Sequence, residues 1–344
     1  MEEEPLMSVP NSADRRPAPY SPLRGLVASH PVVAFLVLAF GFGWISLIPI
    51  LLSENGFGVL PVELPLTVVQ TLATVLGLAL PAFLVTAATG GKEGVRDLLG
   101  RLLRWRVGLH WYLFVLFGLP MGVLLSAIAL HGAAPLGALA RNWALLFTAF
   151  LPGVIVPFLH TNLWEELGWT GFLQSTLQDR RGPLLASLIV VPFFALFHLP
   201  ARFVAGWIVD NHTPLAQVPT VALGYLVLTA VVAVFFRVLI VWVYNGSGRS
   251  VIVVGLFHSA FNITIGKEVM PELLNLPRVR DLPDVLGGAR RARSGGRRVH
   301  QGSSRLRGAT RRVGGSSRST EGALTTDERH HAGTKPPSVP TGRL

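Results

Sequence analysis

The sequence predicts an all-α, polytopic membrane protein with about seven transmembrane helices and a disordered, basic C-terminal tail. Of its 344 residues, 50 % are hydrophobic and only 14 % are charged, against roughly a quarter charged in ordinary soluble domains. Apolar runs long enough to cross a bilayer, about 20 residues each, recur along the chain. The formal charge of +11 is concentrated at one end, because residues 287–344 contain 13 Lys and Arg against 3 Asp and Glu, and residues 1–286 contain 17 against 16.

The expected spans, in chain order, are residues 32–52, 65–88, 109–130, 147–178, 183–201, 218–244 and 249–266. The first follows a polar leader, residues 1–30, and is too long for a signal-peptide core, so we expect an uncleaved anchor. A basic segment separates the second span from the third, Arg180 and Arg181 separate the fourth from the fifth, and Arg249 marks the last turn. Residues 31–286 thus form the membrane-embedded domain. Residues 287–344, rich in Gly, Ser, Arg and Pro, cannot bury a core.

Basic residues in the connecting segments predict a multi-pass protein of the cell membrane with its N-terminus in the cytoplasm, because Lys and Arg are retained on that side. The loop 53–64 contains no Lys or Arg. The leader contains Arg15, Arg16 and Arg24, and the connection after the second span contains Lys92, Arg96, Arg101, Arg104 and Arg106. Leucines at helical spacing among these arginines predict a helix at the lipid interface.

The absence of cysteine excludes disulfides, Cys-ligated zinc, iron–sulfur clusters and thiol nucleophiles. Any catalysis must therefore use carboxylates, imidazoles, hydroxyls or amides. The near-neutral body offers no basic surface for nucleic acid, and we expect no nucleic-acid partner. The tail is expected to be passive, rather than a nucleic-acid arm or a tether to anionic lipid.

Ionisable side chains within the spans are the conspicuous polar feature, because each costs about 2.5–3.5 kcal/mol on membrane insertion and normally faces a cavity or a partner. Three polar clusters occur in the fourth, fifth and seventh spans: Glu165-Glu166-Leu-Gly-Trp169-Thr170, Phe194-Ala-Leu-Phe-His198 and His258-Ser-Ala-Phe-Asn262. At a rise of 1.5 Å per residue, all three lie near mid-membrane. We therefore expect them to converge on one site.

Helical spacing indicates which of these side chains can meet. Residues four apart share a helix face, so His258 and Asn262 can point into one site, and Phe194 can pack under His198. Adjacent glutamates are about 100° apart. We place Glu165 in the site, on the face that also carries Trp169, with Glu166 turned toward position 170.

One carboxylate, two imidazoles and one carboxamide suit hydrolysis. Glutamate can act as general base for water, histidine can orient the water or protonate a leaving amine, and an amide can donate to an oxyanion. The same groups could instead ligate a divalent metal, since two His and one carboxylate form a recognised metal set. The residue pattern leaves both mechanisms open.

In this order on separate membrane helices, the clusters resemble the motifs of the CPBP family of intramembrane proteases, also called the Abi family or type II CAAX prenyl endopeptidases. The family's Glu-Glu-x-x-x-Arg, Phe-x-x-x-His and His-x-x-x-Asn motifs correspond to the segments from Glu165 to Thr170, from Phe194 to His198 and from His258 to Asn262. The resemblance covers roughly residues 140–266.

The resemblance implies an endopeptidase that cleaves a membrane-associated peptide or protein at a membrane-embedded site. Carried over by position, Glu165 activates water with His198, Glu166 supports it, and His258 and Asn262 stabilise the tetrahedral intermediate. Many members are labelled metalloproteases, so Glu165, His198 and His258 are also the candidate ligands of a divalent metal such as zinc.

The chain departs from the family pattern in two places. The motif arginine is Thr170 here, which removes an i,i+4 ion pair with Glu166. The family also has an eighth helix after the third motif, whereas this chain continues with residues 267–286 and the basic tail. Seven spans from a cytoplasmic N-terminus would place that tail outside the cell, and an eighth would return it.

Two other function classes stay open. A catalytically silent family member would act as a membrane binding or immunity protein, an alternative that Thr170 keeps open. A transporter would also place polar residues at mid-membrane. Arg237, in the sixth span, fits such a path or serves as a supporting counter-ion of Glu165 or Glu166. Neither the substrate's identity nor the oligomeric state can be read from these residues.

Overall fold

The membrane domain is a bundle of helices. The computed structural model of the chain describes residues 22–54, 56–202, 215–266 and 268–277, and the regular structure in these ranges is helical, without a strand. Six helical stretches within them are long and apolar enough to cross a membrane: Pro31–Leu52, Leu66–Leu102, Leu109–His131, Leu146–Arg181, Pro183–Pro200 and Val218–Gly246. A shorter apolar helix, α12 (Val251–Ile265), occupies the expected seventh span. The all-α polytopic architecture is confirmed, and the protein is a multi-pass membrane protein.

Two spans are single helices close to their expected bounds, and two others extend slightly further. α2 (Pro31–Leu52) begins at a proline, which suits the first helical turn, and α5 (Leu109–His131) forms the third span. α10 (Pro183–Arg202) and α11 (Val218–Gly246) form the fifth and sixth. A single 3-10 turn, η7 (Leu215–Gln217), precedes α11.

The helical stretch that contains the second span breaks at Gly91, close to the expected end at residue 88, and continues as a separate amphipathic helix. It consists of α3 (Leu66–Thr74), the π-helix η2 (Val75–Ala79) and α4 (Leu80–Leu102), with a kink at Gly91 (φ 59°, ψ −149°), a conformation that suits glycine. Beyond the kink, Leu98 and Leu102 are buried while Leu99 and Leu103 stay exposed. The amphipathic segment expected at the lipid interface therefore buries one edge against protein.

The fourth span alternates between α and π geometry. Its segments are η3 (Leu146–Phe150), α7 (Leu151–Pro157), η4 (Phe158–Asn162), α8 (Leu163–Glu166), η5 (Leu167–Gln174) and α9 (Ser175–Arg181). All eight residues of the π-helix η5 are buried. π-Helical turns are rare and are frequently found at functional sites, and here two of them flank the adjacent glutamates.

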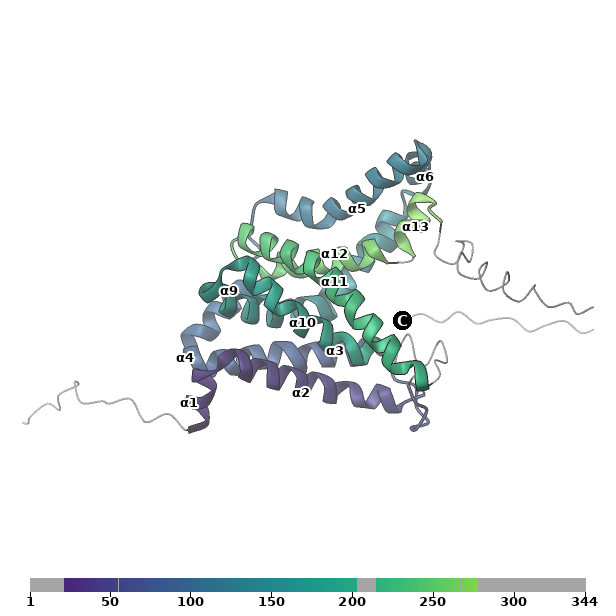
Figure 1. The fold of residues 1–344 in the computed structure, drawn as a ribbon. Coiled ribbons are helices and arrows are strands. Elements are labelled where there is room, and N and C mark those ends of the chain that lie inside the picture. Colours follow the sequence, from purple (N-terminus) through teal and green to yellow (C-terminus); the bar gives the residue numbers. More distant parts are fainter. Residues whose placement is uncertain (1–21, 55, 203–214, 267, 278–344) are drawn as a thin grey trace, which may run out of the picture. The chain divides into compact units, whose positions relative to one another are not determined.

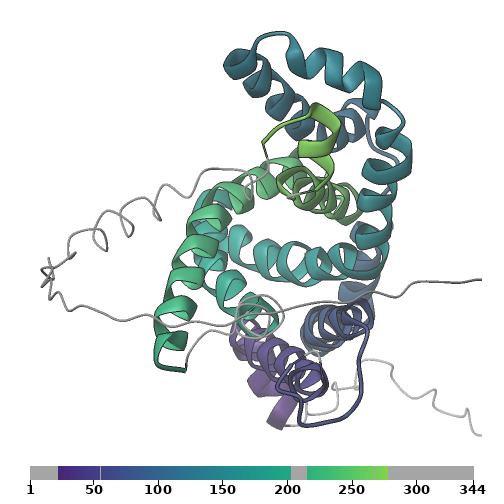
Figure 2. The same cartoon turned by 90° about the vertical axis from the view of Figure 1, so that its right-hand side faces the viewer.

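The packing places α8, η5 and α12 inside the bundle. α12 contacts α5 on one side and α7, η4 and α8 on the other, and α10 packs against α11. Figures 1 and 2 both show α5 beside α12 and α10 beside α11. α2 packs on η2 at a point where a β-carbon added to Gly77 would lie 2.5 Å from Gly43 Cα. This close backbone approach is typical of membrane helices that meet through small residues.

The remaining short helices lie at the ends of the bundle. α1 (Pro22–Ser29) belongs to the expected leader, and Arg24 Nε donates a hydrogen bond to Ala88 O (3.0 Å). α13 (Val269–Leu274) packs against α6 (Ala134–Asn142), where Asn142 Nδ2 donates to Glu272 O (3.0 Å). The leader up to residue 21, the tail expected at 287–344 and any eighth span after residue 277 lie outside the described ranges.

Candidate active site

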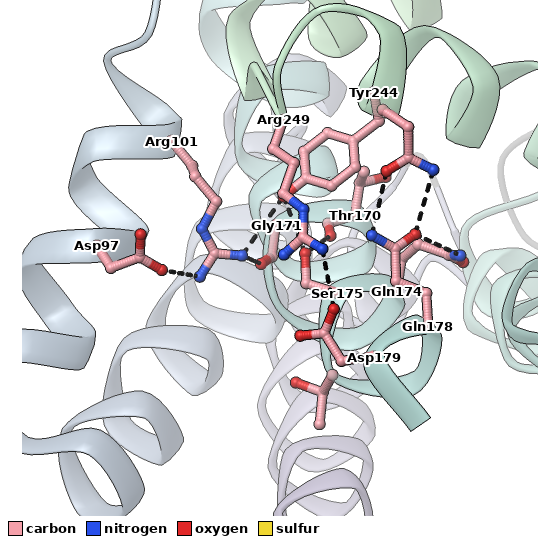
Figure 3. Close-up of polar contacts among 12 residues, drawn as sticks. Asp97, Arg101, Thr170, Gly171, Gln174, Ser175, Gln178, Asp179, Tyr244 and Arg249 are labelled. Atoms are coloured by element: carbon pink, nitrogen blue, oxygen red, sulfur yellow. Dashed lines mark hydrogen bonds and ion pairs between the residues drawn. The ribbon is translucent and has the colours of Figure 1, made fainter. Parts of the chain in front are cut away.

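The two glutamates of the first motif lie on α8, a single α-helical turn between the π-helices η4 and η5. Figure 3 shows how polar side chains hold the backbone that follows. Arg101 Nη1 donates to Gly171 O (2.8 Å), and Ser175 Oγ donates to Thr170 O (3.1 Å) and hydrogen-bonds Tyr244 Oη (2.9 Å). These contacts from α4, α9 and α11 fix the wide turn that carries the motif.

A second group of polar contacts holds the end of this segment. Gln174 Nε2 donates to Pro183 O (3.1 Å), and Gln178 Nε2 donates to Asn245 Oδ1 (3.2 Å). Each bond joins the fourth span to a different helix, so the α9 end of the span is tied to α10 and α11.

Glu165 forms a pair with His198 of α10. His198 Nε2 lies 3.2 Å from Glu165 Oε1, and His198 Nδ1 donates to Phe194 O (2.7 Å). The Phe194 ring lies against the imidazole with centroids 4.4 Å apart. The His198 side chain is 24 % exposed and that of Glu165 only 9 %, so the open side of the pair is at the histidine.

The proton content of this pair follows from its neighbours. A carbonyl oxygen only accepts, so Nδ1 of His198 carries a hydrogen, and an ionised carboxylate also only accepts. A close contact between Nε2 and Glu165 Oε1 therefore needs one further proton between them. With that proton on nitrogen, the pair is a carboxylate beside an imidazolium, which is a base and an acid side by side.

Glu166 is turned toward position 170, where Thr170 Oγ1 donates to its Oε2. Arg237 of α11 supplies the cation: its Nη1 lies 3.0 Å from Glu166 Oε2 and 3.2 Å from Oε1, and its Nη2 donates to Thr170 Oγ1 (2.9 Å). Both charged side chains are fully buried. Arg237 is thus the counter-ion of Glu166. Its guanidinium, on α11, supplies the positive charge that an arginine at position 170 would otherwise supply.

His258 of α12 links the two glutamates. Its Nδ1 donates to Glu166 Oε1 (2.9 Å) and lies 3.8 Å from Glu165 Oε2. The residues brought together are therefore Glu165, Glu166, His198, His258, Thr170, Phe194 and Arg237. Trp169 is buried beside them, with its ring packed against those of Phe194 and Phe197.

Asn262 is placed differently from the rest of its motif. It lies one helical turn beyond His258 on α12, it is exposed, and its side chain makes no hydrogen bond within the described part of the chain. The buried side of α12 at this point is formed by Ala260 and Thr264.

Sequence reasoning missed Asn162 and the residues that hold η5. Asn162, buried at the end of η4, donates from Nδ2 to Glu165 Oε2 (3.1 Å). A polar residue three positions before Glu165 on one helix was a usable signal, because i,i+3 neighbours share a face. Arg101 and Tyr244 gave no such signal, since the residues of the fourth span that they contact lie far away in sequence.

The donor arrangement does not favour a metal site. Within the described ranges no three or more His, Asp or Glu side chains are grouped so that they could hold a metal ion. The proposed ligands Glu165, His198 and His258 instead hydrogen-bond to one another, to Glu166 and to a backbone carbonyl. We therefore derive no catalytic step through a metal.

The site is a buried carboxylate–imidazole pair within a polytopic helical domain, and such a pair provides groups suited to acid–base hydrolysis. Residues 142–264, which contain all three motifs, match the family model described as type II CAAX prenyl endopeptidase Rce1-like. This match confirms the resemblance that the motifs predicted and supports a CPBP/CAAX protease family assignment. The family that this segment matches is one of membrane proteases. A comparison with curated proteins found no match.

Proposed function

We propose that the protein is an intramembrane endopeptidase in which Glu165 activates water for attack on a peptide bond. The observation that carries this proposal is the Glu165–His198 contact, in which Nδ1 of the imidazole is held by Phe194 O and Nε2 faces the carboxylate. This arrangement provides a base and an acid at one point of a largely dehydrated site. General acid–base catalysis of this kind contributes roughly 10²–10⁴-fold to a rate.

The reaction would proceed in two steps. Glu165 takes a proton from water as the oxygen bonds to the scissile carbonyl carbon, and the π electrons of that carbonyl move to its oxygen. His198 Nε2–H then protonates the leaving nitrogen as the carbon–nitrogen bond breaks. The proton held by Glu165 passes to His198 Nε2, which restores the starting pair.

His258 and Asn262 are proposed to stabilise the oxyanion from α12. Because His258 Nδ1 donates to Glu166, it can donate to an oxyanion from Nε2 only when both ring nitrogens carry hydrogens. Glu166 and Arg237 cancel each other's charge, as do Glu165 and a protonated His198. A protonated His258 would then add the positive charge that an oxyanion requires. The exposed position of Asn262 suits a contact with bound substrate.

The substrate is proposed to be a peptide or protein that reaches the site within the membrane. We propose that the protein lies in the cell membrane with its N-terminus in the cytoplasm, and the gathering of basic residues at one end of the helices supports this orientation. Arg24 contacts Ala88 near the Gly91 kink, Ser250 Oγ donates to Arg104 O (2.5 Å), and Arg249 pairs with Asp179 (2.9 Å). A reporter fused to the N-terminus should read out as cytoplasmic.

The test is proteolysis by the protein reconstituted in liposomes, with prenylated and unprenylated peptides as substrates. The parent should cleave, and Glu165→Ala and His198→Ala should lose cleavage. His131→Ala, a control imidazole in the last turn of α5, should cleave like the parent. Equal cleavage by all four proteins would contradict the proposal. Peptide binding without cleavage by the parent would favour the silent alternative.

A further inference from the structure

Asn162 occupies a distinct position beside Glu165. It is 3 % exposed, and its Nδ2 donates to Glu165 Oε2 (3.1 Å) from three residues earlier on the same helical stretch. An ionised carboxylate only accepts hydrogen bonds, so the amide NH₂ group must face Glu165. The amide oxygen is therefore directed away from Oε2.

This amide oxygen, Oδ1 of Asn162, is buried and has no hydrogen-bond partner within the described ranges. An unpaired buried acceptor is unfavourable, and an apolar side chain of similar shape would avoid it. Thr161, the neighbour on η4, shows the ordinary arrangement, since its Oγ1 donates back to Pro157 O (2.9 Å). Asn162 thus leaves free an acceptor that a molecule bound at Glu165 can use.

We propose that Asn162 is a further catalytic residue, which holds the attacking water together with Glu165. This inference rests on the proposed function. The water donates one hydrogen to Glu165 and the other to Asn162 Oδ1, which leaves a lone pair on its oxygen for the carbonyl carbon. Glu165 takes the first hydrogen as the oxygen–carbon bond forms. The second hydrogen stays on the oxygen as the hydroxyl of the tetrahedral intermediate.

The amide N–H has a separate effect on the carboxylate. By holding Oε2, it fixes the rotation of the carboxylate so that Oε1 faces His198 Nε2 at 3.2 Å. The base is therefore oriented by Asn162 from its own helix and by His198 from α10. Both contacts have to be present for the water and the acid to meet at one point.

Kinetics of Asn162→Leu and Asn162→Asp test the proposal. Leucine removes both the donor and the acceptor, and aspartate keeps the shape but loses the donor. Both variants should lower kcat at least about tenfold with little change in KM, because the water and the base are affected rather than peptide binding. Thr161→Val, the control on the same π-helix, should keep the parent's kcat.

Thermal unfolding separates this role from a structural one. In Asn162→Leu the lost bond to Glu165 is offset by removal of the unpaired acceptor, so Tm should change by no more than about 4 °C. A parent-like kcat in the leucine and aspartate variants would overturn the proposal, as would an equal loss of kcat in Thr161→Val. If the leucine variant does not fold, the aspartate variant decides.

Infrared spectroscopy provides a readout that does not need proteolysis. The carboxylate stretching band of Glu165 is identified as the band lost in Glu165→Gln. Asn162→Leu should shift that band, because it removes a hydrogen bond to Oε2, and Thr161→Val should not. An unshifted band would overturn the role of Asn162 whether or not the protein cleaves peptides. Failure of the parent to cleave any peptide would instead contradict the proposed function.

Discussion

Replacing Arg237 by leucine should destabilise the fold by about 3–5 kcal/mol, the usual cost of removing one partner from a buried ion pair. The guanidinium contacts both oxygens of Glu166 and the hydroxyl of Thr170, and neither charged side chain is exposed. Within the described ranges, its loss leaves a buried carboxylate with only Thr170 and His258 as partners. Most of the expected cost is the penalty of that uncompensated charge.

The assay is reversible unfolding in mixed micelles with increasing SDS, followed by the fluorescence of the chain's 8 tryptophans. Arg249→Leu is the matched control, because Arg249 lies 2.9 Å from Asp179 but the two side chains are 44 % and 58 % exposed. Such an exposed pair contributes about 0–1 kcal/mol. The two pairs have nearly equal length, so the comparison isolates burial.

A double-mutant cycle completes the test. Glu166→Gln removes the buried charge, so combining it with Arg237→Leu should cost less than the sum of the single changes by about 2 kcal/mol or more. The reasoning is refuted if Arg237→Leu costs no more than Arg249→Leu, or if the two changes are additive.

Three further predictions concern the same framework. Thr170→Arg should restore most of the stability lost in Arg237→Leu, because an arginine four residues after Glu166 on the helix reaches its carboxylate. Thr170→Arg in the otherwise unchanged protein should destabilise the fold. The unfolding assay measures the double variant and the single variant. Gly77→Ala should lower the unfolding free energy by about 1–3 kcal/mol, since a β-carbon there would lie 2.5 Å from the backbone of α2. In the control Gly100→Ala, where the added β-carbon has nothing within 4 Å, the unfolding free energy should not fall. Proteolysis should keep its rate after dialysis against a chelator, and a loss reversed by added zinc would contradict this.

The spans were predictable because long apolar runs leave little ambiguity. The expected span 109–130 is the helix Leu109–His131, and the expected span 218–244 is the helix Val218–Gly246. The conformation at Gly91, where one helix ends and the next begins, was not predictable from hydropathy. After Gly91 a second helix runs through the polar residues, and its Leu98 and Leu102 pack on the protein, which is a tertiary effect.

The motifs indicated most of the residues that meet at the site but not how they are paired. Arg237 and Glu166 are 71 residues apart in sequence, and His258 and Glu166 are 92 apart, so helical spacing could not select between Glu165 and Glu166 as the partner of Arg237. The π-helical turns were also invisible, because they change the angular step between residues without changing hydrophobicity. Asn162 was missed because it stands outside the three motifs, although it is a local neighbour of Glu165.

The central claim, that Glu165 activates water rather than attacking the peptide itself, is tested by a single turnover in water labelled with oxygen-18. Protein in excess would be mixed with a peptide that the parent cleaves, and the new C-terminal carboxylate analysed by mass spectrometry. The account predicts one labelled oxygen in that product from the first turnover and no product with Glu165→Gln. An unlabelled first-turnover product, or cleavage by Glu165→Gln at the parent's rate, would contradict it.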